Sequence, residues 1–448
     1  MEICTIGGFE EVGKNMTAVK VGEDVFLFDA GLHLPSVIEL QENEDQRKPK
    51  LERDYRRVGA IPNDLILDKI GWRDKVLAIS ISHAHLDHVG GVPYIANRYP
   101  NAKILGSPFT INLLKSILTD DKIRLRNRLI AVKPNSVYTI NGKNEKYKIE
   151  FVHTTHSTIQ CTFPVLHTKE GSFFYGLDLK FDNYPTMGNP PNYDRIKEIG
   201  KKGVKLAVVD ALYSRTEKKP GGEKVARHLL EEAFSKVKSK KAALFVTTFS
   251  SHIERLKNIV EFGRKINRQI IFLGRSLNKY VNVAIEVGLC PFRKNVTLVK
   301  YRSQINSVLK KIEKERGKYL VVCTGHQAEK GSILDRIVKG ETPFKFRQED
   351  NLIFSSSTIP TEPNITSREK MDMKLRKMGV KLQTDVHVHG HGSREDLRDF
   401  LEMVKPEHLI PSHGSIQMIS PMIDLAKEYG YKIGKNSHLV YDGSVLKI

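Results

Sequence analysis

The chain has 448 residues, of which 40% are apolar and 28% are charged, a composition typical of a soluble globular protein. Its length predicts two or three domains of roughly 100–200 residues each. No apolar run approaches the roughly 20 residues that cross a bilayer, and the start MEICTIGG lacks the basic and apolar regions of a signal peptide. The four cysteines are scattered, which argues against a disulfide framework and a thiolate zinc site. We therefore expect a cytoplasmic protein without a membrane partner.

The formal net charge of +20 is concentrated in the middle of the chain. Residues 201–350 contain 33 Lys and Arg against 15 Asp and Glu, whereas residues 1–200 contain 26 against 25. A basic excess in one segment favours a surface for a polyanion, because phosphate neutralisation releases counterions. The alternative that charge alone leaves open is a lysine-rich surface that is only solvated.

The first 200 residues contain many short β-rich segments that are bounded by Gly, Asn, Asp or Pro. The charged segment 36–57 is predicted to be an exposed insertion. Helices are predicted at 92–99 and 109–118. Strands are predicted at 15–21, 24–31, 75–82, 102–107, 147–153, 161–168 and 172–178.

After about residue 205 the pattern changes to an alternation of helices and strands. The first helix, 223–239, has apolar residues such as Val225, Leu229 and Ala233 on one face. Such alternation predicts a parallel sheet with helical crossovers, in a domain of its own. A second helix is predicted at 252–266, and strands are predicted at 243–248, 269–274, 319–325 and 351–357.

The pattern that carries chemistry is H-x-H-x-D-H, which directly follows the apolar run VLAISIS. His83 and His85 lie two residues apart, so in extended backbone they point the same way, and a turn brings Asp87 and His88 near them. Imidazole and carboxylate groups suit Zn²⁺ or another borderline divalent ion. Four ligand-type side chains within six residues argue against an ordinary loop.

Further ligand-type side chains follow other predicted strands. His156, Asp178 and His413 end three such segments, and Asp29 is a candidate to orient a ligand histidine. Together with His83, His85, Asp87 and His88, they have the composition of a dinuclear site that Asp178 bridges. The sequence therefore predicts a site with two divalent metal ions.

These motifs resemble the metallo-β-lactamase superfamily, whose fold is a four-layer αβ/βα sandwich. The chain resembles more closely the ribonuclease J family of the β-CASP branch, in which a second domain is inserted, and it is similar to the shorter archaeal form. This resemblance implies a first part of the metallo-β-lactamase domain at 1–210, a basic β-CASP insertion at 211–365 and a second part at 366–448. The stretches that carry it are GGFEEVGKNM at 7–16, GLDLKFD at 176–182, TGHQAE at 324–329, FSSSTIP at 354–360, HVHGHGS at 387–393 and IPSHGS at 410–415.

The resemblance also implies roles for single residues. Asp210 matches the acidic motif after the metal motifs, and His391 matches the histidine that contacts the reacting phosphate, so this pair is the candidate proton donor. His156 is preferred to His153 because Ser157 follows it, as in the family. One metal would be held by His83, His85, His156 and Asp178, and the other by Asp87, His88, Asp178 and His413.

In the family, polar loops of the inserted domain form a pocket for a 5′-monophosphate. Where relatives have Ser-Gly-His, this chain has His389 before Gly390 and His391, so His389 is either a phosphate contact or a bystander, and His326 stays unassigned. Ordinary turns are the alternative for these loops. The candidate phosphate-binding residues are Ser250, Ser251, His252, Gly274, Arg275, Ser276, Ser355, Ser356, Ser357, His389 and Ser393.

The function implied is that of a metal-dependent ribonuclease that degrades single-stranded, 5′-monophosphorylated RNA in the 5′→3′ direction. Two metal ions, Zn²⁺ or alternatively Mn²⁺, would activate the attacking water. The nearest alternative is a β-CASP endonuclease that cuts RNA internally or at its 3′ end. A small-ester hydrolase is disfavoured by the basic insert, and a non-catalytic RNA-binding scaffold is disfavoured by the complete ligand set. A homodimer is expected.

Overall fold

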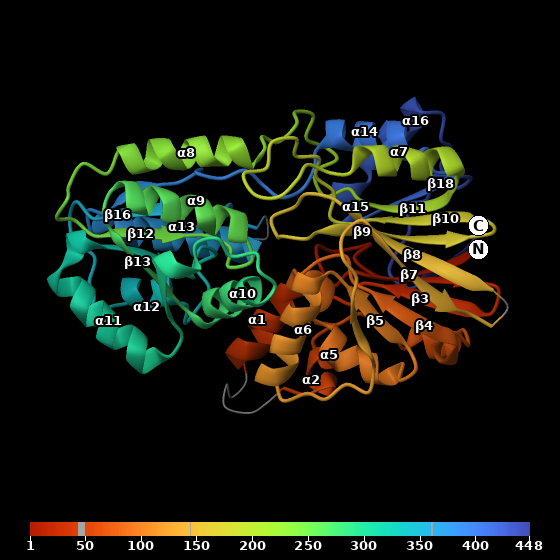
Figure 1. The fold of residues 1–448 in the computed structure, drawn as a ribbon, viewed down its shortest axis with the longest axis horizontal. Coiled ribbons are helices and arrows are strands. Elements are labelled where there is room, and N and C mark those ends of the chain that lie inside the picture. Colours follow the sequence, from red (N-terminus) through yellow and green to blue (C-terminus); the bar gives the residue numbers. More distant parts are fainter. Residues whose placement is uncertain (44–49, 144, 360–361) are drawn as a thin grey trace. The chain divides into compact units, whose positions relative to one another are not determined.

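The computed structural model describes residues 1–43, 50–143, 145–359 and 362–448. The chain folds into two compact units (Figure 1). Unit 1 consists of Met1–Asn183, Asn189–Pro220 and Gly390–Ile448, and unit 2 of Tyr184–Gly188 and Gly221–His389. The domain limits expected from the sequence stay a prediction. No helix in the described ranges is long and apolar enough to span a bilayer.

Unit 1 contains a seven-stranded and a six-stranded sheet. In the first sheet the order is β19-β1-β2-β3-β4-β5-β6, and in the second it is β18-β11-β10-β9-β8-β7. The first sheet comprises β1 (Glu2–Gly7), β2 (Met16–Val21), β3 (Asp24–Phe28), β4 (Val76–Ser80), β5 (Lys103–Gly106), β6 (Leu129–Ala131) and β19 (Ser444–Lys447). The second comprises β7 (Ser136–Asn141), β8 (Lys146–His153), β9 (Thr162–Thr168), β10 (Gly171–Gly176), β11 (Val204–Asp210) and β18 (His408–Ser412).

The two sheets of unit 1 pack face to face, with helices on the outer faces. Phe28 of β3 and Phe173 of β10 meet in the shared core, with ring centroids 4.7 Å apart. The opposite face of the second sheet buries Phe174 against Phe400. In Figure 1, α7 (Tyr193–Lys202) and α14 (Arg394–Val404) lie over the second sheet, and α5 (Val92–Ile95) and α6 (Pro108–Asp120) over the first. This layering confirms the predicted αβ/βα sandwich.

The prediction of an exposed insertion at 36–57 is wrong for both ends of the segment. It contains α1 (Leu34–Asn43) and α2 (Glu52–Arg57), and residues 44–49 lie outside the described part. Val37 and Leu40 of α1 and Tyr55 of α2 are buried. The segment is amphipathic: a narrow apolar stripe is buried, although charged residues dominate the composition on which the prediction was based.

Unit 2 contains one sheet of six parallel strands, in the order β14-β13-β15-β12-β16-β17. This confirms the parallel sheet that the alternating pattern predicts. Helix α11 packs Leu309 and Ile312 onto one face, and α8 and α9 lie over the other in Figure 1. The strands are β12 (Leu244–Thr247), β13 (Gln269–Leu273), β14 (Val296–Val299), β15 (Tyr319–Cys323), β16 (Asn351–Phe354) and β17 (Lys381–Gln383), and the helices are α8 (Glu223–Ser235), α9 (Ile253–Lys265), α10 (Arg275–Glu286), α11 (Arg302–Lys314), α12 (Ile333–Val338) and α13 (Glu362–Lys377).

Candidate metal centre

The sequence-predicted ligands lie at the carboxyl ends of strands in unit 1. His83 and His85 follow β4, and Asp87 and His88 lie on the short helix α4 (Leu86–Val89). The other ligands come from distant parts of the chain, because parallel neighbours deliver their carboxyl ends to the same edge of a sheet. His156 follows β8, Asp178 follows β10, Asp210 ends β11 and His413 follows β18.

The close approach of α4 to the loop after β3 depends on a glycine. A Cβ atom on Gly31 would lie 1.6 Å from the carbonyl oxygen of Asp87, so no other residue fits without moving the helix. The backbone of Ala30 donates to the carbonyl of His88 at 2.8 Å and accepts from Gly91 at 2.8 Å. The turn that carries Asp87 and His88 is thus fixed by backbone contacts with β3.

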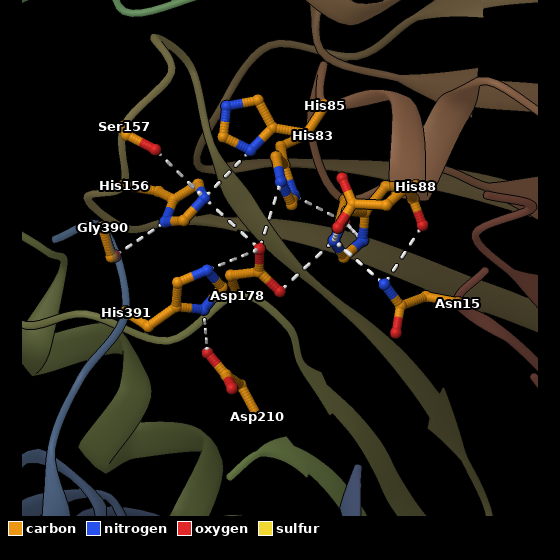
Figure 2. A network of polar contacts seen from close by, with 12 residues as sticks. Asn15, His83, His85, His88, His156, Ser157, Asp178, Asp210, Gly390 and His391 are labelled. Atoms are coloured by element: carbon orange, nitrogen blue, oxygen red, sulfur yellow. Dashed lines mark hydrogen bonds and ion pairs between the residues drawn. The ribbon is translucent and has the colours of Figure 1, made fainter. Parts of the chain in front are cut away.

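Two four-membered groups of ligand atoms share Asp178, and a smaller third group joins it to Asp210 and His391 (Figure 2). Its Oδ2 lies 3.3 Å from Nε2 of His156 and 3.5 Å from Nε2 of His83, whereas its Oδ1 lies 3.3 Å from Nε2 of His88. Within each group the ligand atoms lie within 4.8 Å of one another. One group contains His83, His85, His156 and Asp178, and the other contains Asp87, His88, Asp178 and His413.

The groups fit divalent metal ions on their own chemistry. Nε2 of His83 and Oδ1 of Asp178 are buried and have no hydrogen-bond partner among the described residues. Buried polar atoms are normally satisfied, so their lone pairs indicate a ligand. Five imidazoles and two carboxylates suit borderline divalent ions. The protein therefore has a site for divalent metal.

The ligand histidines are held by hydrogen bonds from their other ring nitrogen. Nδ1 of His88 donates to Oδ2 of Asp29 at 2.7 Å, and Nδ1 of His156 donates to the carbonyl of Gly390 at 2.7 Å. Such bonds fix the tautomer and turn Nε2 toward the metal. Asp29 thus lies where the sequence placed an orienting residue.

Sequence reasoning missed Asn15. Its Oδ1 accepts from Nδ1 of His413 at 3.0 Å, and its Nδ2 donates to the carbonyl of Asp87 at 3.1 Å. Asn15 therefore orients a ligand that follows it by almost 400 residues. The glycine-rich stretch at 7–16, which contains Asn15, could have indicated it. That stretch supported the family resemblance, but no site residue was predicted in it.

Burial and neighbouring charges set the protonation of the ligands. Burial lowers the pKa of His85 to about 4 and the pKa values of His83 and His156 well below 6.5, so all three are neutral at pH 7. Burial raises the pKa of Asp178, but the charges of His413 and His88 outweigh it and hold the pKa well below 3.8. Neutral imidazoles and an ionised carboxylate are the forms that bind metal.

His88 and His391 differ from these three histidines. Burial lowers the pKa of His88, but the carboxylates of Asp178 and Asp87 raise it well above 6.5, so a metal must displace a proton there. For His391, burial likewise lowers the pKa, yet Asp210 and Asp178 raise it to about 9. Nδ1 of His391 donates to Oδ2 of Asp210 at 2.7 Å (Figure 2). His391 is therefore protonated at neutral pH and held by a carboxylate.

Two histidines near these motifs lie elsewhere. His153 ends β8, where its Nε2 donates to the carbonyl of Asn189 at 3.0 Å, and none of the described metal-binding groups includes it. His326 is buried in unit 2 against the ring of Phe249, with ring centroids 4.3 Å apart.

The candidate phosphate loops of unit 2 follow β12, β13 and β16, at the carboxyl edge of its sheet. The hydroxyls of Ser250 and Ser276 lie 2.9 Å apart, and Arg275 is exposed at the start of α10. Oγ of Ser356 is buried without a hydrogen-bond partner among the described residues. The remaining members in these loops are Gly274, which is the N-cap of α10, the exposed Ser357 and the buried Ser251 and His252.

Two candidates have structural bonds that the sequence did not suggest. Oγ of Ser355 donates to the carbonyl of Val386 at 3.0 Å and accepts from the buried Arg255 at 3.0 Å. In unit 1, Ser393 caps α14, and its amide donates to Asp396 at 3.0 Å. His389 lies in unit 2, six residues after the end of β17.

Fold and site together define a metallo-β-lactamase-type hydrolase with an inserted parallel-sheet unit. Three family models match the chain: "Metallo-beta-lactamase superfamily" over residues 10–159, "Ribonuclease J, beta-CASP domain" over 241–369, and "Zn-dependent metallo-hydrolase RNA specificity domain" over 377–435. The chain belongs to the ribonuclease J family.

The chain is 39% identical to Ribonuclease J of Methanocaldococcus jannaschii over 448 residues, which cover all of this chain and 98% of that protein. It is also 39% identical to Ribonuclease J of Pyrococcus abyssi, with 97% of that protein covered. Ribonuclease J 1 of Streptococcus pyogenes is 27% identical and is covered to 74%. A crystal structure of a protein of unknown function from Enterococcus faecalis has the same fold, with a TM-score of 0.62, 16% identity and 99% of each chain covered.

Proposed function

We propose that this protein is a 5′→3′ exoribonuclease that acts on single-stranded RNA with a 5′-monophosphate. The observation that carries the proposal is Asp178, whose two oxygens face two separate groups of ligand atoms. One ion would be held by His83, His85, His156 and Asp178, and the other by Asp87, His88, Asp178 and His413. The family relation supports RNA as the substrate.

When bound, two divalent ions activate water at neutral pH and stabilise charge that develops on the phosphate. The residues of the chain supply orientation and a proton. His391 is protonated at neutral pH, and its Nε2 lies 3.9 Å from Oδ2 of Asp178. It donates its proton to the leaving 3′ oxygen, and Asp210 fixes the ring through Nδ1.

The preference for a 5′-monophosphate is assigned to the loops at the carboxyl edge of the unit 2 sheet. Small hydroxyls and amides at a helix start bind phosphate well, and an arginine binds it through two parallel hydrogen bonds. Ser250, Arg275 and Ser276 have these groups, and the unpaired buried hydroxyl of Ser356 supports a ligand there. Ser355 does not contact the phosphate in this proposal; its hydroxyl stabilises the loop after β16 through its bonds to Val386 and Arg255.

Three finer assignments belong to the same proposal. Zn²⁺ is preferred to Mn²⁺ because the two ligand groups together contain five imidazoles and only two carboxylates. Metal analysis of the purified protein, with reconstitution by each ion after chelation, tests this preference. A homodimer and a cytoplasmic location rest on the family resemblance, and light scattering of the purified protein tests the dimer.

The decisive experiment compares three RNAs of one sequence that carry a 5′-monophosphate, a 5′-triphosphate or a 5′-hydroxyl. We expect mononucleotides to be released in order from the monophosphate RNA, and only slow turnover of the other two. The variant His83→Ala with His85→Ala is the inactive control. Internal fragments that appear regardless of the 5′ group would instead establish an endonuclease and refute the proposal.

A further inference from the structure

Exposed basic side chains that form no ion pair among the described residues gather at the amino edge of the unit 2 sheet. Because all six strands are parallel, the segments that precede them lie at one edge, and the candidate phosphate loops lie at the other. Residues 236–241, between α8 and β12, contain four lysines and no acidic residue. This stretch is called the lysine segment below. Its four lysines are Lys236, Lys238, Lys240 and Lys241, and all are exposed.

Several acidic residues of the same edge are already paired. Glu313 binds Arg316 at 2.6 Å and also binds Arg347. Asp350 binds Arg316 at 2.5 Å, and Glu349 binds Lys381. By contrast, the four lysines form no ion pair with any residue that the structure describes, and neither do the exposed Arg264 and Lys294 before β13 and β14. The edge is therefore left with a local excess of free positive charge.

The lysine segment has a fixed backbone. The buried guanidinium of Arg268 donates to the carbonyls of Ser239 at 3.3 Å and Ala242 at 3.0 Å, and also to that of Tyr319. Gly317 approaches the segment so closely that a Cβ there would lie 1.8 Å from the carbonyl oxygen of Lys240. These contacts hold the segment against the start of β15. The lysines thus project from an ordered surface, which lowers the entropy lost when they bind a partner.

The chemistry of this edge fits a chain of phosphates. Lysine is a point charge that binds phosphate without demanding a particular base, so a row of lysines suits the backbone of a nucleic acid. A protein partner normally requires an apolar centre with aromatic anchors. The exposed large apolar residues described next to these strand starts are Ile266 and Met378, and neither is aromatic.

We propose that the lysine segment is a second RNA-binding surface, which holds the substrate by its phosphates at the edge of unit 2 opposite the candidate phosphate loops. It would raise the affinity for long RNA and keep the RNA bound between successive cleavages. The proposal rests on RNA as the substrate, as the proposed function states. It adds a site that the metal centre and the 5′-phosphate loops do not include.

The test is a variant in which the four lysines become glutamine (Lys236→Gln, Lys238→Gln, Lys240→Gln and Lys241→Gln). The matched control removes four exposed lysines of unit 1 that form no ion pair with described residues (Lys201→Gln, Lys202→Gln, Lys432→Gln and Lys435→Gln). Both variants have the same net charge. Binding is measured in a His391→Ala background so that the RNA stays intact, and cleavage is measured without that substitution.

We expect the unit 2 variant to bind an RNA of about 40 nucleotides at least tenfold more weakly, with a salt slope lower by about 2 to 3, because each lost phosphate contact contributes about 0.7. Cleavage of an RNA of about five nucleotides stays unchanged, and the control variant keeps its affinity for the long RNA. The proposal is overturned if both variants lose the same affinity for the long RNA, or if the unit 2 variant loses none. A protein inactive on every RNA contradicts the proposed function instead, because binding is measured separately.

Discussion

Each of the two carboxylate oxygens of Asp178 faces a different group of candidate metal ligands. One of its oxygens lies 3.3 Å from His156 and the other lies 3.3 Å from His88, so one side chain serves both ligand groups. Around them, several ligand rings are fixed by a partner on the side away from Asp178, such as Asp29 for His88 and Asn15 for His413. The site thus depends on residues that never contact the metal.

The first prediction concerns Asp29, which accepts from Nδ1 of His88 and from the hydroxyl of Ser82. In the variant Asp29→Asn, the amide either offers a weaker acceptor or turns a donor toward the ring. We expect the affinity for metal to fall by about 10- to 100-fold. Titration against a competing chelator measures this affinity. The control is Asp24→Asn at the other end of β3, which should leave the metal affinity unchanged.

The second prediction concerns His391 and Asp210, which share a hydrogen bond of 2.7 Å. We expect His391→Ala to lower kcat by about 10²- to 10⁴-fold through loss of the proton donor, and Asp210→Asn to act through the same ring. The double variant should therefore be little worse than His391→Ala alone. Single-turnover cleavage measures the rates, and metal content should stay constant. Fully multiplicative losses in the double variant would show that the two residues act independently.

At the scale of elements, unit 2 is held together by a buried arginine that the sequence did not single out. Arg255 of α9 is fully buried and binds both oxygens of Glu223, at 2.5 and 2.7 Å. It also donates to Ser355 at the end of β16 and contacts Nδ1 of His387 at 3.2 Å. Arg255 therefore joins the first helix of the unit to the segment by which the chain leaves it.

The third prediction is that Arg255→Met lowers the free energy of unfolding by about 3–5 kcal/mol, because Glu223 would remain buried without its partner. Adding Glu223→Gln should restore part of this loss. Arg227→Met is the control, because Arg227 also links α8 to α9 through an ion pair with Glu261 but is partly exposed. Urea unfolding measures all three. A loss below about 1 kcal/mol, as expected for the exposed pair, would contradict the prediction.

Elements were predicted well where the sequence pattern was local. The strands that end in ligands and the alternating helices of unit 2 follow from short apolar runs between glycines and polar residues. The predicted helix at 92–99 is instead the short α5 followed by a 3₁₀ turn, Ala96–Arg98. The apolar stripes of α1 and α2 were missed because charged residues dominate the segment around them.

At the scale of the whole molecule, the two ends of the chain lie in the same sheet. Strand β19 pairs with β1, and Asp442 just before β19 accepts from the amide of Phe9 at 3.1 Å. Burial and then the nearby Glu11 raise the pKa of Asp442 to about 7, although Lys14 lies 3.5 Å away. The joint between the ends of the chain is therefore sensitive to pH.

The fourth prediction follows from this shift. Because Asp442 has a higher pKa folded than unfolded, where it is about 3.9, the folded state binds more protons between pH 4 and pH 7. Its stabilising contribution is present below about pH 4 and is lost as the pH rises toward 7. The free energy of unfolding of Asp442→Asn, relative to that of the wild type, should therefore be about 2 to 4 kcal/mol higher at pH 8 than at pH 4.5.

Urea unfolding of the metal-free protein at both pH values tests the Asp442 prediction. The control is Asp74→Asn, because the side chain of Asp74 is almost fully exposed. If the difference between Asp442→Asn and the wild type is the same at both pH values, then Asp442 does not carry the pH dependence.

The sequence by itself indicated the family and the layered fold, and it singled out the candidate metal ligands. It did so because ligand-type residues stand at the ends of short apolar strands, a pattern that needs no long-range information. Only the tertiary structure decided which groups orient those ligands, as the side chain of Asn15 and the backbone carbonyl of Gly390 do. It alone also revealed the buried Arg255 and placed the lysine segment at one edge of a parallel sheet. These features depend on contacts between residues far apart in the chain, and no local pattern encodes them.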